Sequence, residues 1–119
     1  YNYKDTPKDV YYRLSECARL SQELGVLVPI FPMRFQPILK IDSHRKYVGE
    51  HWTLKERTGF MNLIASVSPF GGIYCRTTQS FKYWFGDNAD QFKKMLNYPN
   101  LKELIAKRKG YARRLRYEN

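Results

Sequence analysis

The sequence has few of the residues that build metal and disulfide sites. It contains two cysteines, Cys17 and Cys75, and two histidines, His44 and His51. The cysteines lie far apart and outside any C-x-x-C pattern, which favours free thiols and a reducing compartment. None of the four residues shows the local spacing of zinc ligands. We therefore expect no metal and no cofactor.

The chain also lacks long apolar runs and the common catalytic signatures. A membrane-spanning helix needs at least about 18 consecutive apolar residues, and no such run occurs. Glycine-rich phosphate-binding loops and the G-x-S-x-G turn of hydrolases are absent as well. We expect a soluble protein without a membrane span. The sequence favours a binding protein over an enzyme and assigns no catalytic residue.

Acidic residues are scarce relative to basic ones. The chain has 21 Lys and Arg against 11 Asp and Glu, a formal net charge of +10. Seven of these basic residues lie within 101–119 beside only Glu103 and Glu118, so this segment carries a net charge of +5. Such a density of like charge repels itself and is typically neutralised by a polyanion or an acidic protein surface.

What the chain does contain is sufficient for a folded core. Its 119 residues are 43% hydrophobic and 16% aromatic, well above the composition of disordered chains. A chain of this length buries roughly two-thirds of its unfolded surface. We expect a single domain over 1–119, with 101–119 as a basic C-terminal helix or arm.

Two helices are indicated by their start signals. Thr6 can cap a helix that begins at Pro7, with Asp9 completing a box-like pair and Gly25 placed to end it, so the pattern predicts a helix over 7–24. Thr53 and Glu56 form a second capping-box pattern, followed by apolar residues at helical spacing up to Val67.

The segments between these helices read as strands. Residues 26–41 are rich in β-branched and aromatic side chains but contain three prolines, which is typical of edge or bulged strands. Residues 46–52 and 73–77 add two further short strands. Residues 81–85 fit either a strand or a helix. The fold class that follows is α+β, with an N-terminal helix, a small antiparallel sheet of short proline-interrupted strands, and further helices.

The last third of the chain returns to helical patterns. Asp87-Asn88 can cap a short helix carrying Phe92, Met95 and Leu96, and Asn100 can begin a final helix after the break at Pro99. If this helix continues through Gly110, its apolar residues share one face and Lys102, Lys109, Arg113 and Arg116 form a nearly opposite stripe. If it ends at Gly110, residues 111–117 become an extended basic arm.

The function that this pattern favours is nucleic-acid binding, with DNA and RNA both open. Lys and Arg attract phosphates, and exposed aromatic rings stack on unpaired bases. We expect Phe35, Trp52, Phe81 and Phe85 to point inward and Tyr47, Tyr83, Tyr111 and Tyr117 to be contact candidates. The predicted contact residues are Lys102, Lys107, Arg108, Lys109, Tyr111, Arg113, Arg114, Arg116 and Tyr117, with Arg45, Lys46 and Lys82 as secondary positions.

Two alternatives stay open at this point. The first is a basic accessory subunit of a large assembly, such as a ribosome or an organellar complex, whose protein or RNA neighbours bury its apolar patches. The second is a metal-independent ribonuclease in which His44 and His51 act as general base and acid. The sequence fixes neither the oligomeric state nor the compartment.

Overall fold

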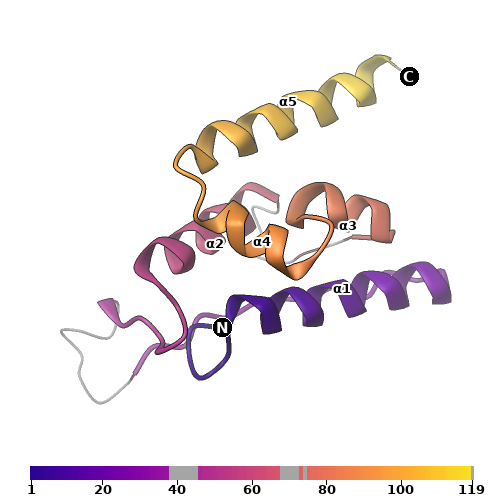
Figure 1. The fold of residues 1–119 in the computed structure, drawn as a ribbon. Coiled ribbons are helices and arrows are strands. Elements are labelled where there is room, and N and C mark those ends of the chain that lie inside the picture. The colour runs from indigo at the N-terminus through magenta and orange to yellow at the C-terminus, as the bar shows by residue number, and fades with distance from the viewer. Residues whose placement is uncertain (38–45, 68–72, 74, 119) are drawn as a thin grey trace.

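The chain folds as a set of helices connected by short and extended segments (Figure 1). The computed structural model describes residues 1–37, 46–67, 73 and 75–118, with only the backbone described over 112–118. Within these residues the helices are α1 (Pro7–Leu24), α2 (Leu54–Val67), α3 (Thr78–Phe85), α4 (Ala89–Leu96) and α5 (Leu101–Glu118). The predicted α+β fold with a small antiparallel sheet is therefore wrong.

Both predicted capping boxes are present and begin the expected helices. The Thr6 hydroxyl accepts from the Asp9 N–H at 3.1 Å, and the Asp9 carboxylate accepts from the Thr6 N–H at 2.9 Å. Thr53 and Glu56 make the same reciprocal pair at the start of α2. Each box satisfies two backbone groups that a helix start leaves without partners. The predicted bounds of α1 and α2 are confirmed.

Side-chain caps also determine where α3 and α4 begin. The Thr77 side chain accepts from the Ser80 N–H and caps the helix over 78–85, so the helical alternative for 81–85 is confirmed. The described residues of the predicted strand over 73–77 form only the isolated bridge at Ile73. The Asn88 side chain likewise accepts from the Gln91 N–H at 2.9 Å and starts α4 as expected. These short helices need their caps because an isolated helix of this length is marginal in water.

The segment over 26–37 is extended but forms no strand. Ile30 makes one isolated antiparallel bridge with Ile73, while the Val28 N–H donates to the Ser21 hydroxyl at 2.8 Å. The backbone N–H groups of this segment thus donate to different parts of the chain, and its prolines, which lack an N–H, prevent a continuous ladder of strand hydrogen bonds. Residues 47–52 likewise form turns and coil rather than the predicted strand. Residues 38–45, part of the predicted strand and turn, lie outside the described residues.

Aromatic side chains form the centre of the core. Phe60, Phe81, Phe85 and Phe92 are almost completely buried. The Tyr11 ring of α1 packs 5.1 Å from Phe81 and 5.6 Å from Phe92, between ring centroids. Its hydroxyl donates to the Gly86 carbonyl at 2.7 Å, which satisfies its polar tip. Helix α1 is thereby held against both α3 and α4.

Three of the four predicted inward aromatics are confirmed. Trp52 is buried, as are Phe81 and Phe85. Phe35 instead remains 38% exposed, and the prediction for it is wrong. It lies on the extended segment beside Tyr3 and Tyr47, with centroid distances of 4.3 and 5.5 Å. Phe35 and Tyr3 therefore belong to a small aromatic group at the surface rather than to the core.

Helix α5 lies on the side of the molecule opposite α1, with α3 and α4 between them (Figure 1). It continues through Gly110 to Glu118, so the helical alternative for the C-terminal segment is confirmed. Its first turns pack on the body through Leu101 and Ile105, which are both buried. At Gly59, α2 passes so close to the α4–α5 connection that an added Cβ would lie 3.1 Å from the Leu96 carbonyl.

Candidate nucleic-acid interface

Arg108 differs from the other predicted phosphate contacts because its side chain faces the body. Its Nη1 donates to the Trp84 carbonyl at 3.3 Å and contacts the Met95 Sδ at 3.2 Å. The Tyr83 hydroxyl donates to the Arg108 carbonyl at 2.7 Å. Burial is the main cause that raises the pKa of the Tyr83 phenol, so this hydroxyl stays protonated and able to donate. This geometry argues for Arg108 as an anchor of α5 rather than a phosphate ligand.

The lysines of α5 are free to meet a ligand. Lys102, Lys107 and Lys109 are exposed. None of them makes an ion pair with any acidic group in the described part of the chain. Lys102 and Lys109 lie seven residues apart, nearly two full turns, so they project from the same side of the helix. That side faces α2, so the two described lysines of the predicted stripe flank the apolar face instead of opposing it.

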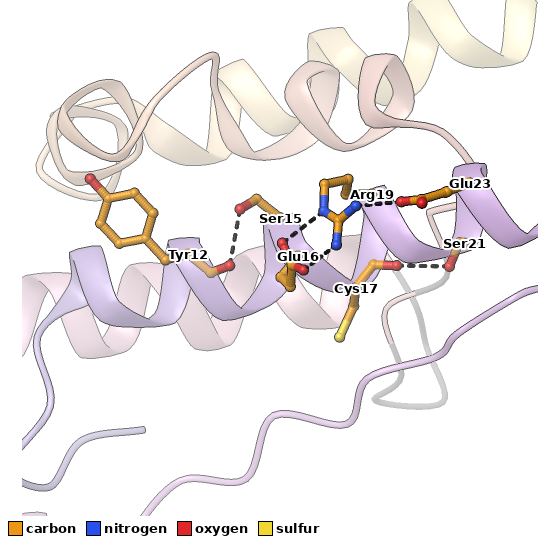
Figure 2. Close-up of polar contacts among 7 residues, drawn as sticks. All are labelled: Tyr12, Ser15, Glu16, Cys17, Arg19, Ser21 and Glu23. Atoms are coloured by element: carbon orange, nitrogen blue, oxygen red, sulfur yellow. Dashed lines mark hydrogen bonds and ion pairs between the residues drawn. The ribbon is translucent and has the colours of Figure 1, made fainter.

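Cations on α1, by contrast, are matched by carboxylates. Arg19 lies between Glu16 and Glu23, with 3.0 Å from its Nε to the Glu16 carboxylate (Figure 2). Lys8 pairs with Asp90 of α4 at 2.6 Å. Hydrogen bonding to Lys8 lowers the pKa of Asp90 and keeps this pair charged at neutral pH. The surface carried by α1 is thus close to neutral, whereas Lys102, Lys107 and Lys109 of α5 have no carboxylate partner among the described residues.

A groove runs between α2 and α5. Its wider section has a volume of about 690 Å³ and its narrower section about 400 Å³, and both are lined by Asn62 and Lys102. Small side chains at Ala65, Ser66 and Ala106 keep the narrower section open. The floor of the wider section is mainly apolar, and Lys109 closes the far end of the groove.

The other flank of α5 meets α3. The Tyr111 ring lies 6.2 Å from the Tyr83 ring and is about half exposed. Lys82 is exposed and lines a shallow depression with Tyr83. The structure therefore places Tyr111 of α5 beside Tyr83 of α3, on the side away from the α2 groove, whereas no described residue of α5 lines the depression at Lys82. The Tyr83 hydroxyl already bonds to Arg108, which leaves its ring as the part that can contact a ligand.

The remaining predicted residues are less well placed or are not described. Lys46 is exposed and lies in the connection before α2. Tyr47, beside it, is half-buried, and its carbonyl accepts from Asn2 and Arg57. Arg45 lies outside the described residues, as do the side chains of Arg113, Arg114, Arg116 and Tyr117 within α5.

The histidines and cysteines form no recognisable reaction centre in the described residues. His51 is exposed and its Nε2 lies 3.1 Å from the Glu50 carboxylate, while His44 falls outside the described part. Cys17 and Cys75 are both free thiols. Among the residues that are described, no three His, Cys, Asp or Glu side chains are grouped as metal ligands. Nor does any described helix combine the length and apolar character needed to cross a bilayer.

Comparison with known protein families, with curated proteins and with solved structures finds no match to this chain. The class that the coordinates define is an all-α protein with one cationic helix packed at its edge. Its function has to be inferred from the chemistry of that edge.

Proposed function

We propose that this protein binds nucleic acid through the cationic surface of α5. The observation that carries the proposal is the contrast between α5 and α1. Lys102, Lys107 and Lys109 have no acidic partner in the described structure, whereas Lys8 and Arg19 are neutralised. Exposed cations on a rigid helix can displace the counterions of a phosphate backbone without first breaking an internal ion pair.

The proposed contact set is centred on the described lysines and extends along the helix. Arg113, Arg114 and Arg116 follow on the same continuous helix and add to its charge. Tyr111 contributes from the side of α5 that faces α3, and Lys82 contributes from α3. Arg108 takes a different role, because its bonds to the Trp84 carbonyl and to Met95 hold α5 in place. The predicted enzyme alternative with His44 and His51 gains no support from the described residues.

The proposal is tested by measuring how affinity depends on salt. The double variant Lys102→Gln/Lys109→Gln should bind duplex DNA more weakly than the wild type. The slope of log K against log salt should also become shallower by up to about 1.8, since each lost phosphate contact removes about 0.9. Fluorescence anisotropy titrations at several salt concentrations provide both quantities.

The matched control is Lys8→Gln/Arg19→Gln, which removes the same formal charge from the opposite side of the molecule. We expect its salt slope to equal that of the wild type. Equal losses in both double variants would show that only net charge matters, and an absence of binding at low salt would overturn the proposal. Thermal unfolding of each variant checks that the fold is retained.

A role as a subunit of a larger assembly is the second candidate, and exposed apolar side chains favour it. Leu24 and Val26 are 62% and 58% exposed, and Met33 is 81% exposed. They lie at the end of α1 and on the extended segment that follows. Apolar groups on such a segment are typical of surfaces that a partner covers. If this is their role, Met33→Glu should reduce self-association of the isolated protein in sedimentation experiments, and an unchanged profile would count against it.

A further inference from the structure

The groove between α2 and α5 has a composition that a phosphate-binding surface does not require. Its floor in the wider section includes Leu96, Leu101 and the backbone of Gly59. An anionic phosphate placed against such a floor would lose water without gaining a hydrogen bond, which is costly. Phosphates are therefore expected at the lysines on the rim, and the floor suits a flat and largely apolar group.

The groove also offers the polar and aromatic groups that recognise a nucleobase. The side-chain amide of Asn62 is partly buried and hydrogen-bonds to no other described residue. An amide has both donors and an acceptor, as needed to pair with the edge of a base. Tyr98 is 50% exposed at the margin of the wider section and provides a ring for stacking.

The charges along the groove suit a single strand of nucleic acid that lies over it. Lys102 and Lys109 are about 10 Å apart along the helix axis, which leaves room for a base between the phosphates they would hold. Lys55 adds a cation on the α2 wall, and Glu103 provides the one acidic group of the lining, at the α5 end of the wider section. The Glu103 carboxylate repels a phosphate placed beside it, so the phosphates are expected at the lysines.

We propose that the groove between α2 and α5 receives an unpaired base of a single-stranded nucleic acid, while Lys102 and Lys109 hold the flanking phosphates. The inference rests on the proposed function and deepens it by naming the ligand class. A duplex keeps its base faces stacked and can meet only the rim, whereas an unpaired strand can turn a base toward the apolar floor.

Ala106→Leu tests this assignment because Ala106 is exposed and its larger replacement would fill the narrower section without entering the core. The control is Gly110→Leu on the same helix, where an added Cβ meets nothing within 4 Å. Both variants are titrated with labelled oligothymidylate, oligouridylate, an abasic strand of equal length and a duplex. The abasic strand retains the phosphates but presents no base.

The wild type should bind either base-containing strand about 5- to 150-fold more tightly than the abasic strand, as expected for stacking of one base. Tyr98→Ala, which removes the ring that lines the wider section, should abolish this difference and leave abasic and duplex affinities unchanged. Ala106→Leu fills only the narrower section, between Lys102 and Lys109, and should reduce the difference, while Gly110→Leu should preserve it. Asn62→Ala should reduce the difference in part. Equal wild-type affinity for base-containing and abasic strands would overturn the inference while the phosphate surface still stands. Failure to bind any of the probes would overturn the proposed function itself.

Sedimentation of the same samples tests whether a second copy of the chain occupies the groove instead. If the wild type is a dimer that Ala106→Leu dissociates, a second copy of the chain fills the groove and the nucleobase assignment is wrong. A monomer in both cases, together with the expected loss of base-dependent affinity, supports the assignment.

Discussion

The Tyr83 hydroxyl donates to the Arg108 carbonyl at 2.7 Å, and the guanidinium of the same arginine lies 6.0 Å from the centroid of the Tyr83 ring. One aromatic residue of α3 therefore contacts both the backbone and the side chain of one residue in α5. This pair holds the cationic helix against the body beyond the apolar contacts of Leu101 and Ile105.

Removing the Tyr83 hydroxyl should loosen α5. We expect Tyr83→Phe to lower the free energy of unfolding by about 1 kcal/mol, the usual net value of one hydrogen bond. Amides in α5 should also exchange faster with solvent. Lys107→Met is the control, since Lys107 is exposed and has no partner in the described residues. Unchanged stability and exchange in Tyr83→Phe would show that the bond contributes nothing to docking.

Two glycines should respond to alanine with opposite sign. At Gly59 the new Cβ would lie 3.1 Å from both the Leu96 carbonyl and the Leu101 Cδ2, so Gly59→Ala should destabilise the protein by about 1 to 3 kcal/mol. At Gly110 the Cβ meets open space within a helix, so Gly110→Ala should stabilise it by up to about 1 kcal/mol. Urea unfolding measures both. Equal effects would contradict the close approach of α2 to the α4–α5 connection.

The two thiols should differ in reactivity. Cys75 is 4% exposed, and burial raises the pKa of its thiol to about 11. Since the thiolate is the reactive species, Cys75 should resist alkylation in the native protein at neutral pH and react once the protein unfolds. Cys17 is partly exposed and should be modified first. Peptide mass spectrometry after timed iodoacetamide treatment distinguishes them, and equal native rates would contradict the buried position of Cys75.

Acid should weaken the cap of α1. Hydrogen bonding to the Thr6 backbone lowers the pKa of Asp9 below its ordinary value of 3.8. A carboxyl with a lowered folded-state pKa contributes stability above that ordinary value and loses it as the pH falls through the folded-state pKa. Because Asp9 is exposed and screened, the contribution is expected to be a few tenths of a kcal/mol.

Asp9→Asn isolates this contribution. The variant should be slightly less stable than the wild type at neutral pH, and the difference should vanish at a pH well below the folded-state pKa of Asp9, where the wild-type carboxyl is protonated. Chemical denaturation at the two pH values provides the comparison. A difference that persists unchanged in acid would assign the effect to side-chain geometry rather than charge.

The helices that begin with local side-chain caps could be predicted from the sequence. Thr6 with Asp9 and Thr53 with Glu56 specify their helices within four residues, so no distant contact is needed to recognise them. Strands are different, because a strand requires a partner that supplies its hydrogen bonds. Residues 26–37 have the composition of strands, but among the described residues they form a single isolated β-bridge, between Ile30 and Ile73. The Phe35 N–H donates to the Tyr1 carbonyl without extending that bridge into a ladder.

The candidate site could be predicted in its charge but not in its shape. The clustering of cations near the C-terminus is visible in the sequence, as is the helical spacing of Lys102 and Lys109. Arg108 follows Leu101 by seven residues and Leu104 by four, and this spacing is the signal that it faces the body. The groove depends on Ala65, Ser66 and Ala106 coming together from two helices, which the spacing within either helix does not reveal.

Neutral α1 and charged α5 on opposite sides give the molecule a permanent electric asymmetry (Figure 1). A molecule with this charge distribution reorients in the electric field of a distant polyanion before contact, so that its lysine-bearing side arrives first. Salt should then slow the approach of the protein more than it shortens the lifetime of the complex. The carboxylates beside Arg19 on the far side would in this way act on orientation without ever touching the ligand.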